Sequence, residues 1–199
     1  MSRNLEMSVF KSPLGWFAVA GLGGRILWCS VGHSSRAAAA RHARACVSGD
    51  IAVRDWHPEV RRRLIAFATG EHVTFDDLPL PLDGIPAFHR AVLGACRRIG
   101  YGRTITYAQL AAAAGRPRAV RAAGTAMARN PLPIIIPCHR VIRSDGGLGG
   151  YSAPQGVSLK ARLLALEAVA EKSHAGTGAA RSARRRRHAT RGVQSRRTA

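Results

Sequence analysis

A cysteine and a histidine are adjacent in the apolar, proline-bounded segment Pro137–Val141 (Pro-Cys-His-Arg-Val). The thiolate is the nucleophilic form of cysteine, and an imidazole within reach can take the proton of the thiol. Neighbouring side chains in an extended strand point to opposite faces, so their contact needs a turn or a bridging water molecule. Glu167, an acid on an otherwise apolar helix, is the candidate to hold the other ring nitrogen of His139. These residue types predict nucleophilic chemistry at Cys138.

A lone cysteine in an apolar run is more commonly a buried core residue, and composition and spacing alone leave that alternative open for Cys138. We adopt the core interpretation for Cys29, Cys46 and Cys96. The four cysteines contain no CxxC pair and imply no disulfide framework, which is typical of a reduced, cytosolic chain. Cys29 and His33 have a spacing possible for zinc, but no second pair completes a tetrahedral site, so we predict no metal.

Two short helices are expected before this segment. Thr106 and Gln109 have the spacing of a capping box for a helix that ends at Gly115, and Pro117 is typical of the start of another that runs to about Ala128. A pair joined this closely indicates a helix-turn-helix, although any helical hairpin has the same pattern.

Arginines decide between these two interpretations. Arg116, Arg118 and Arg121 surround the start of the second helix, with no acid nearby. Recognition helices make contacts through their first turns, and helix N-termini favour phosphate. The pattern therefore favours a DNA-binding helix pair.

Other elements must position these residues. Pro86 to Gly100 has the apolar stripe of a helix, residues 134–136 indicate a short buried strand or extended run, and residues 146–150 indicate a flexible loop. A last helix is expected over 158–170, with Leu159, Leu163 and Leu166 facing inward.

The first part of the chain has a different pattern. Residues 7–31 contain short apolar runs between turn signals and predict strands, residues 34–47 and 58–69 predict helices, and residues 72–75 predict one more strand. A proline-rich linker follows over 76–84. We therefore expect an α/β (α+β) fold: an N-terminal domain with a small antiparallel sheet and helices over 1–83, a mostly helical, winged-helix-like domain over 84–171, and a disordered basic tail over 172–199.

The charge points to a polyanionic partner. Lys and Arg number 31 against 11 Asp and Glu, which gives a net charge of +20. The segment 172–199 holds nine basic and no acidic residues, and the remainder of the chain is basic too. Such a field attracts nucleic acid, although an arginine-rich proteome produces a similar composition. No apolar run spans a membrane and no secretion signal begins the chain, so we expect a cytoplasmic location, at the nucleoid when bound to DNA.

The segment Pro137–Val141 resembles the active-site signature of the O6-alkylguanine-DNA alkyltransferases, also called methylated-DNA–protein-cysteine methyltransferases. The similarity continues through 104–111 (TITYAQLA), 121–124 (RAAG), 130–134 (NPLPI), 149–152 (GGYS) and 160–167. Together these stretches cover about residues 86–170 in the order of the family and with nearly its spacing. Residues 1–83 are compatible with the variable domain of the family, but the match there is much weaker.

The resemblance implies roles for the central residues. Cys138 is the expected alkyl acceptor, His139 is expected to deprotonate it through a water molecule, and Glu167 is expected to hold His139. Asn130 is expected to brace the turn that orients the helices and the active-site loop. Tyr107 is expected to help rotate the target nucleotide and to donate a proton to the departing guanine. From the residues alone, Tyr107 packing in a core and Asn130 capping a helix remain open.

The resemblance also implies a DNA interface and a pocket. Arg121 is expected to fill the gap that a flipped nucleotide leaves in the base stack. The other residues expected at the DNA interface are Arg116, Arg118, Ala122 and Thr125. The residues expected to line the substrate pocket are Pro137, Val141, Tyr151 and Ser152. In this family the second helix enters the minor groove, although a helix-turn-helix ordinarily reads the major groove. From the residues alone, Arg121 as a simple phosphate contact remains open.

The implied function is direct DNA repair. The target nucleotide must be flipped out before the sulfur can approach its alkyl group in line. The resulting thioether is not readily cleaved by water, so each molecule is expected to act once, on O6-alkylguanine and possibly on O4-alkylthymine. We expect the chain to act without a cofactor, as a monomer bound to double-stranded DNA, with no membrane contact.

Two features depart from the family pattern. Tyr151-Ser152 is followed by Ala-Pro-Gln-Gly over 153–156 where the family commonly has two glycines, and about two extra residues precede Lys160. This loop borders the alkyl pocket in the family, so it bears on which alkyl groups fit. The basic segment 172–199 is not a family feature, and we expect it to add salt-sensitive, non-specific affinity for DNA.

Two other classes of function remain as alternatives. A non-catalytic, alkyltransferase-like lesion-binding protein typically has Trp at the position of Cys138. A helix-turn-helix transcriptional regulator with an inert cysteine leaves the Cys-His segment and Glu167 unexplained.

Overall fold

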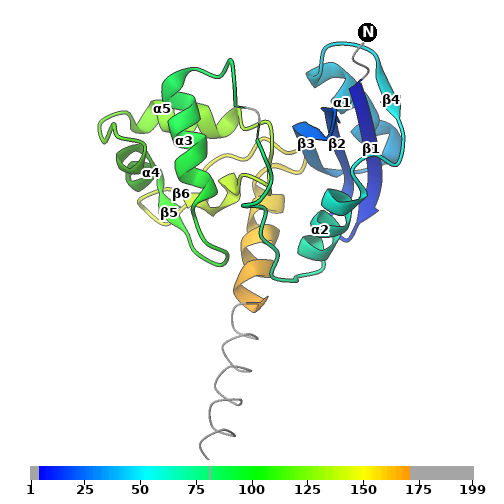
Figure 1. The fold of residues 1–199 in the computed structure, drawn as a ribbon. Coiled ribbons are helices and arrows are strands. Elements are labelled where there is room, and N and C mark those ends of the chain that lie inside the picture. Colours follow the sequence, from blue (N-terminus) through cyan, green and yellow to red (C-terminus); the bar gives the residue numbers. More distant parts are fainter. Residues whose placement is uncertain (1–4, 81, 171–199) are drawn as a thin grey trace, which may run out of the picture.

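The computed structural model describes residues 5–80 and 82–170. Figure 1 shows two regions side by side, with the C-terminal helix, residues 156–170, running between them. We call residues 5–80 the sheet region and residues 82–170 the helical region. No helix in these ranges is long and apolar enough to cross a membrane.

The sheet region contains four strands in the order β3-β2-β1-β4. The strands β1 (Leu5–Ser12), β2 (Gly15–Leu22) and β3 (Arg25–His33) pair antiparallel, which confirms the predicted sheet. Gly23 and Gly24 connect β2 to β3 with positive φ angles of 54° and 79°, as a tight hairpin turn requires. The short strand β4 (Ile51–Val53) adds parallel to β1 and was not expected.

Each face of the sheet is covered by one helix. The helix α1 (Arg36–Cys46) packs Ala39 and Ala43 against Met7, Ala18, Ala20 and Trp28. The helix α2 (Pro58–Ala68) buries Val60, Leu64 and Phe67 on the other side, together with Phe10 and Phe17. Both helices lie where the sequence predicts them. A helix of alanines can approach a sheet closely, whereas the larger side chains of α2 fill a thicker layer.

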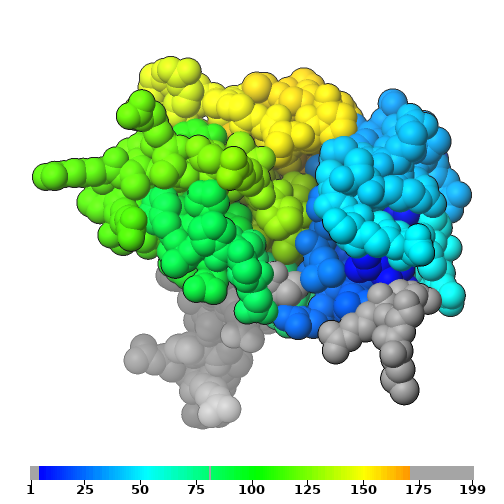
Figure 2. Space-filling model, turned by 90° about the horizontal axis from the view of Figure 1, so that it is seen from above, coloured from blue at the N-terminus to red at the C-terminus, as the bar shows by residue number. Residues whose placement is uncertain are grey.

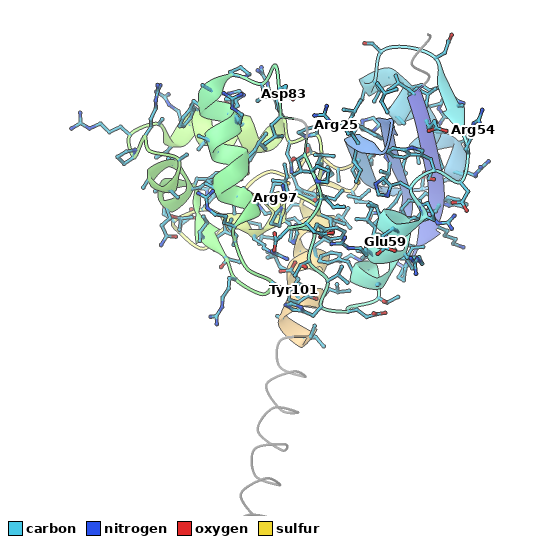
Figure 3. The ribbon with its side chains drawn as sticks, viewed as in Figure 1. Arg25, Arg54, Glu59, Asp83, Arg97 and Tyr101 are labelled. Atoms are coloured by element: carbon cyan, nitrogen blue, oxygen red, sulfur yellow. The ribbon has the colours of Figure 1, made fainter. Side chains whose placement is uncertain are left out.

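The strand predicted over residues 72–75 is absent, because this segment pairs with no strand. Arg63 Nη2 instead donates to Thr74 O, and the Nη2 atom of Arg97 donates to three backbone oxygens at and beyond the end of the segment, those of Phe75 (2.8 Å), Asp76 (2.8 Å) and Leu78 (2.7 Å). Arg97 lies at the side of the helical region that faces the sheet region (Figure 3). The two guanidinium groups therefore satisfy the carbonyls of Thr74 and Phe75, which a neighbouring strand would otherwise pair.

The helical region is built on three helices, α3 (Ala87–Arg97), α4 (Tyr107–Ala113) and α5 (Val120–Ala128). Beside them β5 (Ile105–Thr106) pairs parallel with β6 (Val141–Ile142). The capping box is present: Gln109 N donates to Thr106 Oγ1 (3.1 Å) and Thr106 N donates to Gln109 Oε1 (2.7 Å). The helices α4 and α5 form the predicted helix-turn-helix pair.

The second helix of this pair begins later than predicted, at Val120 and not at Pro117. Ala119 N donates to Arg116 O (2.9 Å), which closes a separate turn over 116–119. Proline is favoured at the second position of such a turn, where its fixed φ fits. Arg116 and Arg118 therefore belong to the turn, and Arg121 alone of the three stands in the first turn of α5.

The prediction of a strand or extended run over 134–136 is also wrong. Ile134 has a φ of 72°, and Ile136 N donates to Leu132 O (2.7 Å), so the chain turns tightly here. All three isoleucines are buried, as predicted. A β-branched residue rarely adopts a positive φ, which marks this turn as one held by its surroundings.

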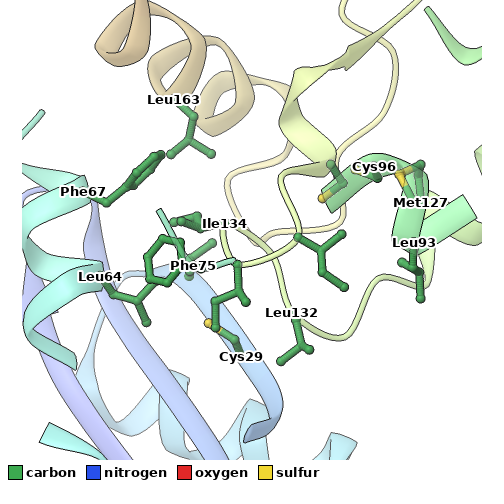
Figure 4. Close-up of a cluster of buried hydrophobic side chains, with 14 of the residues drawn as sticks. Cys29, Leu64, Phe67, Phe75, Leu93, Cys96, Met127, Leu132, Ile134 and Leu163 are labelled. Atoms are coloured by element: carbon green, nitrogen blue, oxygen red, sulfur yellow. The ribbon is translucent and has the colours of Figure 1, made fainter. Parts of the chain in front are cut away.

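One hydrophobic core runs through both regions. Phe67, Leu64, Phe75 and Cys29 come from the sheet region, and Figure 4 shows them close to side chains of the helical region. The partners drawn there include Leu93, Cys96, Met127, Leu132, Ile134 and Leu163. Leu159 and Leu163 of the C-terminal helix are buried and Leu166 is half-buried, as predicted. The domain division at residues 83 and 84 stays a prediction, and the segment 172–199 lies outside the described residues.

Candidate active site

A tight loop carries Cys138, and the Asn130 side chain holds that loop. Asn130 Nδ2 donates to Ile136 O (2.9 Å), and Asn130 Oδ1 accepts from Leu132 N (3.0 Å). The loop leads into η1 (Cys138–Arg140), one turn of 3₁₀ helix, in which Cys138 N donates to Ile136 O (2.8 Å). This is the turn that the adjacent Cys-His pair needs, because an extended strand would separate the two side chains.

The Cys138 side chain lines a pocket of about 430 Å³. The other lining residues are Tyr107, Gly124, Met127, Ala128, Gly150, Tyr151 and Ser152. The structure thus brings Cys138, Tyr107, Tyr151 and Ser152 together, as the sequence predicts. Pro137 lines a different hollow, and Val141 is fully buried, so neither is among the residues that line the Cys138 pocket.

His139 is fully buried and is held by an acid from the C-terminal helix. Its Nε2 atom lies 2.8 Å from Glu167 Oε1. Its other nitrogen, Nδ1, is buried and has no hydrogen-bond partner among the residues that the structure describes. The geometry therefore brings the predicted His139–Glu167 pair together and leaves one imidazole nitrogen available for proton transfer.

Arg140 is a buried member of this site to which the sequence assigned no role. Its Nη2 and Nε atoms donate to Glu167 Oε1 (2.8 and 3.1 Å), and its Nη1 atom donates to Ile99 O (2.5 Å). Glu167 Oε2 also accepts from Gly102 N (3.0 Å). A signal existed: the helical region contains only three acids, Asp83, Asp145 and Glu167, and a buried arginine in an apolar motif needs one.

The charges of this network are set by burial and by each other. Burial raises the pKa of Glu167, but the hydrogen bonds and charges of His139 and Arg140 outweigh it and bring the pKa to about 2. Burial lowers the pKa of His139, and its contact with Glu167 opposes this shift only in part. At neutral pH the network therefore holds a carboxylate, a guanidinium and a neutral imidazole that can accept a proton.

The thiol of Cys138 is held in its neutral form. Burial raises its pKa, while the side chain of Asn130 and the charge of Lys160 act to lower it. Lys160 is itself fully buried, and its Nζ atom donates to Val141 O (2.6 Å) and to Leu148 O. The sequence assigned no role to Lys160 either. A buried thiol of this kind needs a base before it can react.

Two tyrosines close the pocket. Tyr107 is the first residue of α4, and burial raises the pKa of its hydroxyl, so it remains a proton donor near neutral pH. Gly149 leaves room for it, because a Cβ atom there would lie 3.1 Å from the Tyr107 hydroxyl oxygen. Tyr151 has a buried hydroxyl with no hydrogen-bond partner among the described residues.

The predicted DNA-binding residues lie outside this pocket on the surface. Arg121, Ala122 and Thr125 are exposed on one face of α5, while Ala123, Ala126 and Met127 on the opposite face are buried. Arg116 and Arg118 are exposed in the preceding turn. Because Gly124 and Ala128 of the same helix line the pocket, the exposed face of α5 leads to its mouth.

No group of three or more His, Cys, Asp or Glu side chains in residues 5–80 and 82–170 could hold a metal ion. Cys29 and Cys96 are buried, as expected for core cysteines, whereas Cys46 is exposed on α1. The core interpretation of Cys46 is therefore wrong.

Comparison with known proteins identifies similar chains. Residues 87–169 match the family model described as 6-O-methylguanine DNA methyltransferase, DNA binding domain. A constitutive methylated-DNA–protein-cysteine methyltransferase of Bacillus subtilis is 45% identical over 114 residues, which cover 57% of this chain and 67% of the relative. A methylated-DNA–protein-cysteine methyltransferase of Mus musculus is 47% identical over 105 residues, 50% of this chain and 49% of the relative.

Solved structures extend the similarity to the sheet region. Mycobacterium tuberculosis OGT in complex with DNA has a TM-score of 0.69 and 32% identity, and the match covers 83% of this chain and 94% of that one. The O6-methylguanine-DNA methyltransferase of Pyrococcus kodakaraensis has a TM-score of 0.64 and 28% identity over 81% of this chain and 98% of that one.

Proposed function

The chain belongs to the methylated-DNA–protein-cysteine methyltransferase family, and from this premise we propose that it repairs O6-alkylguanine in double-stranded DNA by moving the alkyl group to Cys138. One observation carries the assignment to Cys138. Its thiol lines a pocket at the end of the exposed helix face that carries Arg121, and a buried imidazole and carboxylate lie nearby in the same motif and the C-terminal helix.

The proposed transfer begins at the thiol. The Nδ1 atom of His139 accepts the proton of Cys138 through a bridging water molecule, and Glu167 stabilises the imidazolium that forms. The sulfur attacks the alkyl carbon in line, the S–C bond forms, and the C–O6 bond breaks with its electron pair going to guanine. Tyr107 donates a proton to the departing base. The step needs no cofactor, and the thioether product means that each molecule acts once.

The proposed DNA contacts lie on α5 and the turn before it. Arg121 enters the base stack in place of the flipped nucleotide, which offsets part of the few kcal/mol that flipping costs. Ala122 and Thr125 are small, so the helix backbone can approach the DNA closely, and Arg116 and Arg118 bind phosphates. We propose that this face enters the minor groove, where contacts carry little sequence information and the protein can search any sequence.

Asn130 is proposed as a positioning residue. Its two hydrogen bonds hold the loop that carries Cys138, and its side chain acts to lower the pKa of the thiol. Tyr151 and Ser152 are proposed to contact the flipped base, because they line the same pocket as Cys138 and Tyr107. Pro137 and Val141 are proposed to shape the pocket indirectly through the loop.

Intact mass measurement tests the proposal. The protein is incubated with a duplex that contains O6-methylguanine, and we expect the mass of one methyl group to be gained on Cys138 and the gain to be absent in Cys138→Ser. Binding of the lesion duplex without a mass gain would indicate a non-catalytic lesion-binding protein. Equal affinity for lesion and undamaged duplexes, again without a mass gain, would indicate a helix-turn-helix regulator. An O4-methylthymine duplex in the same assay tests the second substrate.

We further propose that the chain acts as a monomer in the cytoplasm. Light scattering of the protein with and without a short duplex tests the first point, and cell fractionation tests the second. A dimer mass in either light-scattering sample would contradict the monomer.

A further inference from the structure

Two segments far apart in the sequence meet beside the pocket, and the proposed transfer uses neither. One is the turn between β1 and β2, residues 12–15, and the other is the loop over 153–156, which directly follows the pocket residue Ser152. Gln155 from this loop donates through Nε2 to Gly32 O (2.7 Å) at the end of β3 and to Leu14 O (3.4 Å) in the turn. One side chain thus ties the loop to the sheet region.

The other end of the same amide is also held. Gln155 Oε1 accepts from Arg162 Nη1 (3.1 Å), and Arg162 Nη2 donates to Pro13 O (3.2 Å). Both polar atoms of Gln155 are therefore used, and two side chains connect the start of the C-terminal helix to the same turn. A side chain bound at both ends keeps one orientation.

The backbone of β3 is shaped to receive this contact. Gly32 has a φ of 81°, and a Cβ atom there would lie 2.5 Å from Leu159 Cδ2 and 3.1 Å from Gln155 Nε2. Any side chain at this position would push both residues away. The close approach of the loop to the sheet thus depends on glycine at this position.

The connection from Gln155 to the pocket is short and stiff. Ser152 lines the pocket, and only Ala153 and Pro154 separate it from Gln155. Proline fixes its own φ and restricts the residue before it, and Gly156 N donates to Ala153 O (2.8 Å) across the turn. A displacement of Gln155 would therefore be passed on to Ser152 with little loss.

We call residues 152–154, which begin at the pocket residue Ser152, the wall of the Cys138 pocket, and open space lies on the other side of this wall. Ser152, Ala153 and Pro154 also line a second hollow of about 370 Å³, whose remaining lining includes Trp28 and Ser30 of β3. Figure 2 shows the yellow segment near residue 150 extending from the green helical region toward the blue and cyan sheet region. With a hollow on each side, the wall has room to move away from Cys138, and the Gln155 contacts oppose that movement.

We propose that Gln155 is a positioning residue that fixes the wall of the Cys138 pocket against the sheet region and thereby limits the size of the O6 substituent that fits. The inference rests on the proposed function, since it concerns the alkyl group offered to Cys138. It assigns the sheet region a part in substrate selection, through Leu14 and Gly32.

The test compares two substrates in single-turnover transfer, O6-methylguanine and O6-benzylguanine in the same duplex. In Gln155→Ala we expect the ratio of the benzyl rate to the methyl rate to rise by about threefold to tenfold, the range that the loss of one or two hydrogen bonds produces. Gln155→Glu keeps the size of the side chain and the acceptor for Arg162, but it loses the donor to Gly32 O. We expect the ratio to rise in Gln155→Glu too.

Val157→Ala is the matched control, because Val157 follows the same loop, is 45% exposed and takes no part in the hydrogen bonds of Gln155 and Arg162. We expect its ratio to equal that of the unaltered protein. A merely structural role for Gln155 would slow both substrates equally and leave the ratio unchanged, and that result would overturn the inference. If the unaltered protein transfers the methyl group but the ratio is unchanged in both Gln155 variants, the inference is overturned and the proposed function stands. No methyl gain in the unaltered protein would overturn the proposed function and the inference with it.

Discussion

The sheet region and the helical region place their charged pairs differently. Pairs within the sheet region, such as Arg62–Glu59, are at the surface, with side chains 74% and 54% exposed. The Arg25–Asp83 pair, which joins the two regions, is also exposed (57% and 89%). The helical region has an exposed pair too, Arg143–Asp145. However, its Arg140 and Glu167 side chains are only 9% and 1% exposed, and His139 joins them with none of its side chain exposed. Figure 3 shows Arg25 and Asp83 near each other between the two regions.

The difference follows from the cost of burying charge. Removing an ion from water costs several kcal/mol, and mutual attraction repays this only where hydrogen bonds satisfy every charged atom. Glu167 accepts from His139, Arg140 and Gly102, so its charge is satisfied without water. A chain that needed stability alone would gain as much from apolar side chains here. The buried pair therefore marks the region where the chemistry needs a fixed charge.

The largest expected effect is that of Glu167→Gln. The amide leaves Arg140 buried without a counter-charge and weakens the orientation of His139. We expect the free energy of unfolding to fall by about 3 kcal/mol or more, measured by urea denaturation. We expect single-turnover methyl transfer to slow by about 100-fold or more. Asp77→Asn, which breaks a pair with Arg63 whose carboxylate is 67% exposed, is the control and should change neither quantity by a comparable amount. Equal losses of stability and transfer rate in the two variants would contradict the view that the buried charged pair matters more than the exposed ones.

The second prediction concerns stability as a function of pH. The pKa of Glu167 falls from its ordinary 4.5 to about 2 in the folded protein, so its carboxylate stabilises the fold above pH 4.5. We expect about 3 kcal/mol of the free energy of unfolding to be lost as the pH falls from 4.5 toward 2. His139, whose pKa is lowered by burial, adds a loss as the pH falls below 6.5.

Urea denaturation at a series of pH values measures this loss. Glu167→Gln serves as the reference, because it cannot titrate at that position and should show a shallower slope below pH 4.5. The same slope in both proteins would assign the acid sensitivity to other carboxyl groups.

Tyr107→Phe is expected to separate catalysis from stability. It removes only the hydroxyl that is proposed to protonate the departing guanine. We expect transfer to slow by about 10-fold to 100-fold, within the usual range for a general acid. The free energy of unfolding should change by less than about 1 kcal/mol. Single-turnover kinetics and urea denaturation of one preparation provide both numbers. A transfer rate equal to that of the unaltered protein would remove Tyr107 from the reaction.

The smallest effect is expected for Arg25→Ala. The Arg25–Asp83 pair is exposed and its two atoms are 3.4 Å apart, so we expect the free energy of unfolding to change by less than about 0.5 kcal/mol. Methyl transfer should stay the same. A loss near 2 kcal/mol would show that this pair holds the linker against the sheet. Exposed and buried charged pairs would then differ less in their contribution to the free energy of unfolding.

Local sequence signals predicted the elements that local forces decide. The capping box at Thr106 and Gln109 and the positions of α1, α2 and α3 follow from side chains within one or two turns. The strand β4 and the loop over 72–75 did not follow, because the pairing of three or four residues depends on contacts made elsewhere. For residues 72–75 the contacts are those of Arg63 with Thr74 O and of Arg97 with Phe75 O, and the two arginines lie 11 and 22 residues away in the sequence.

In the site, too, some residues could be predicted from the sequence and others could not. Cys138, His139 and Glu167 follow from residue types and from the family motif, and the structure brings His139 and Glu167 together. Arg140 stands in the same motif, but its role appears only when η1 turns both residues toward one carboxylate. The contacts of Gln155 join positions more than 120 residues apart, and no sequence pattern indicates them. The turn at Ile134 was missed because isoleucine favours extended backbone.

The core that continues from Phe67 and Leu64 through Ile134 to Leu93 has a consequence for unfolding. Two regions with separate cores would melt independently, and a calorimeter would record two transitions. Side chains that pack in one cluster lose their contacts together, so we expect one cooperative transition with the same midpoint for every probe. A fragment that began at residue 84 would expose the surface that now meets α2 and β3. The loop that carries Cys138 therefore depends on the packing of both regions. Heat should inactivate the protein and unfold it at the same temperature.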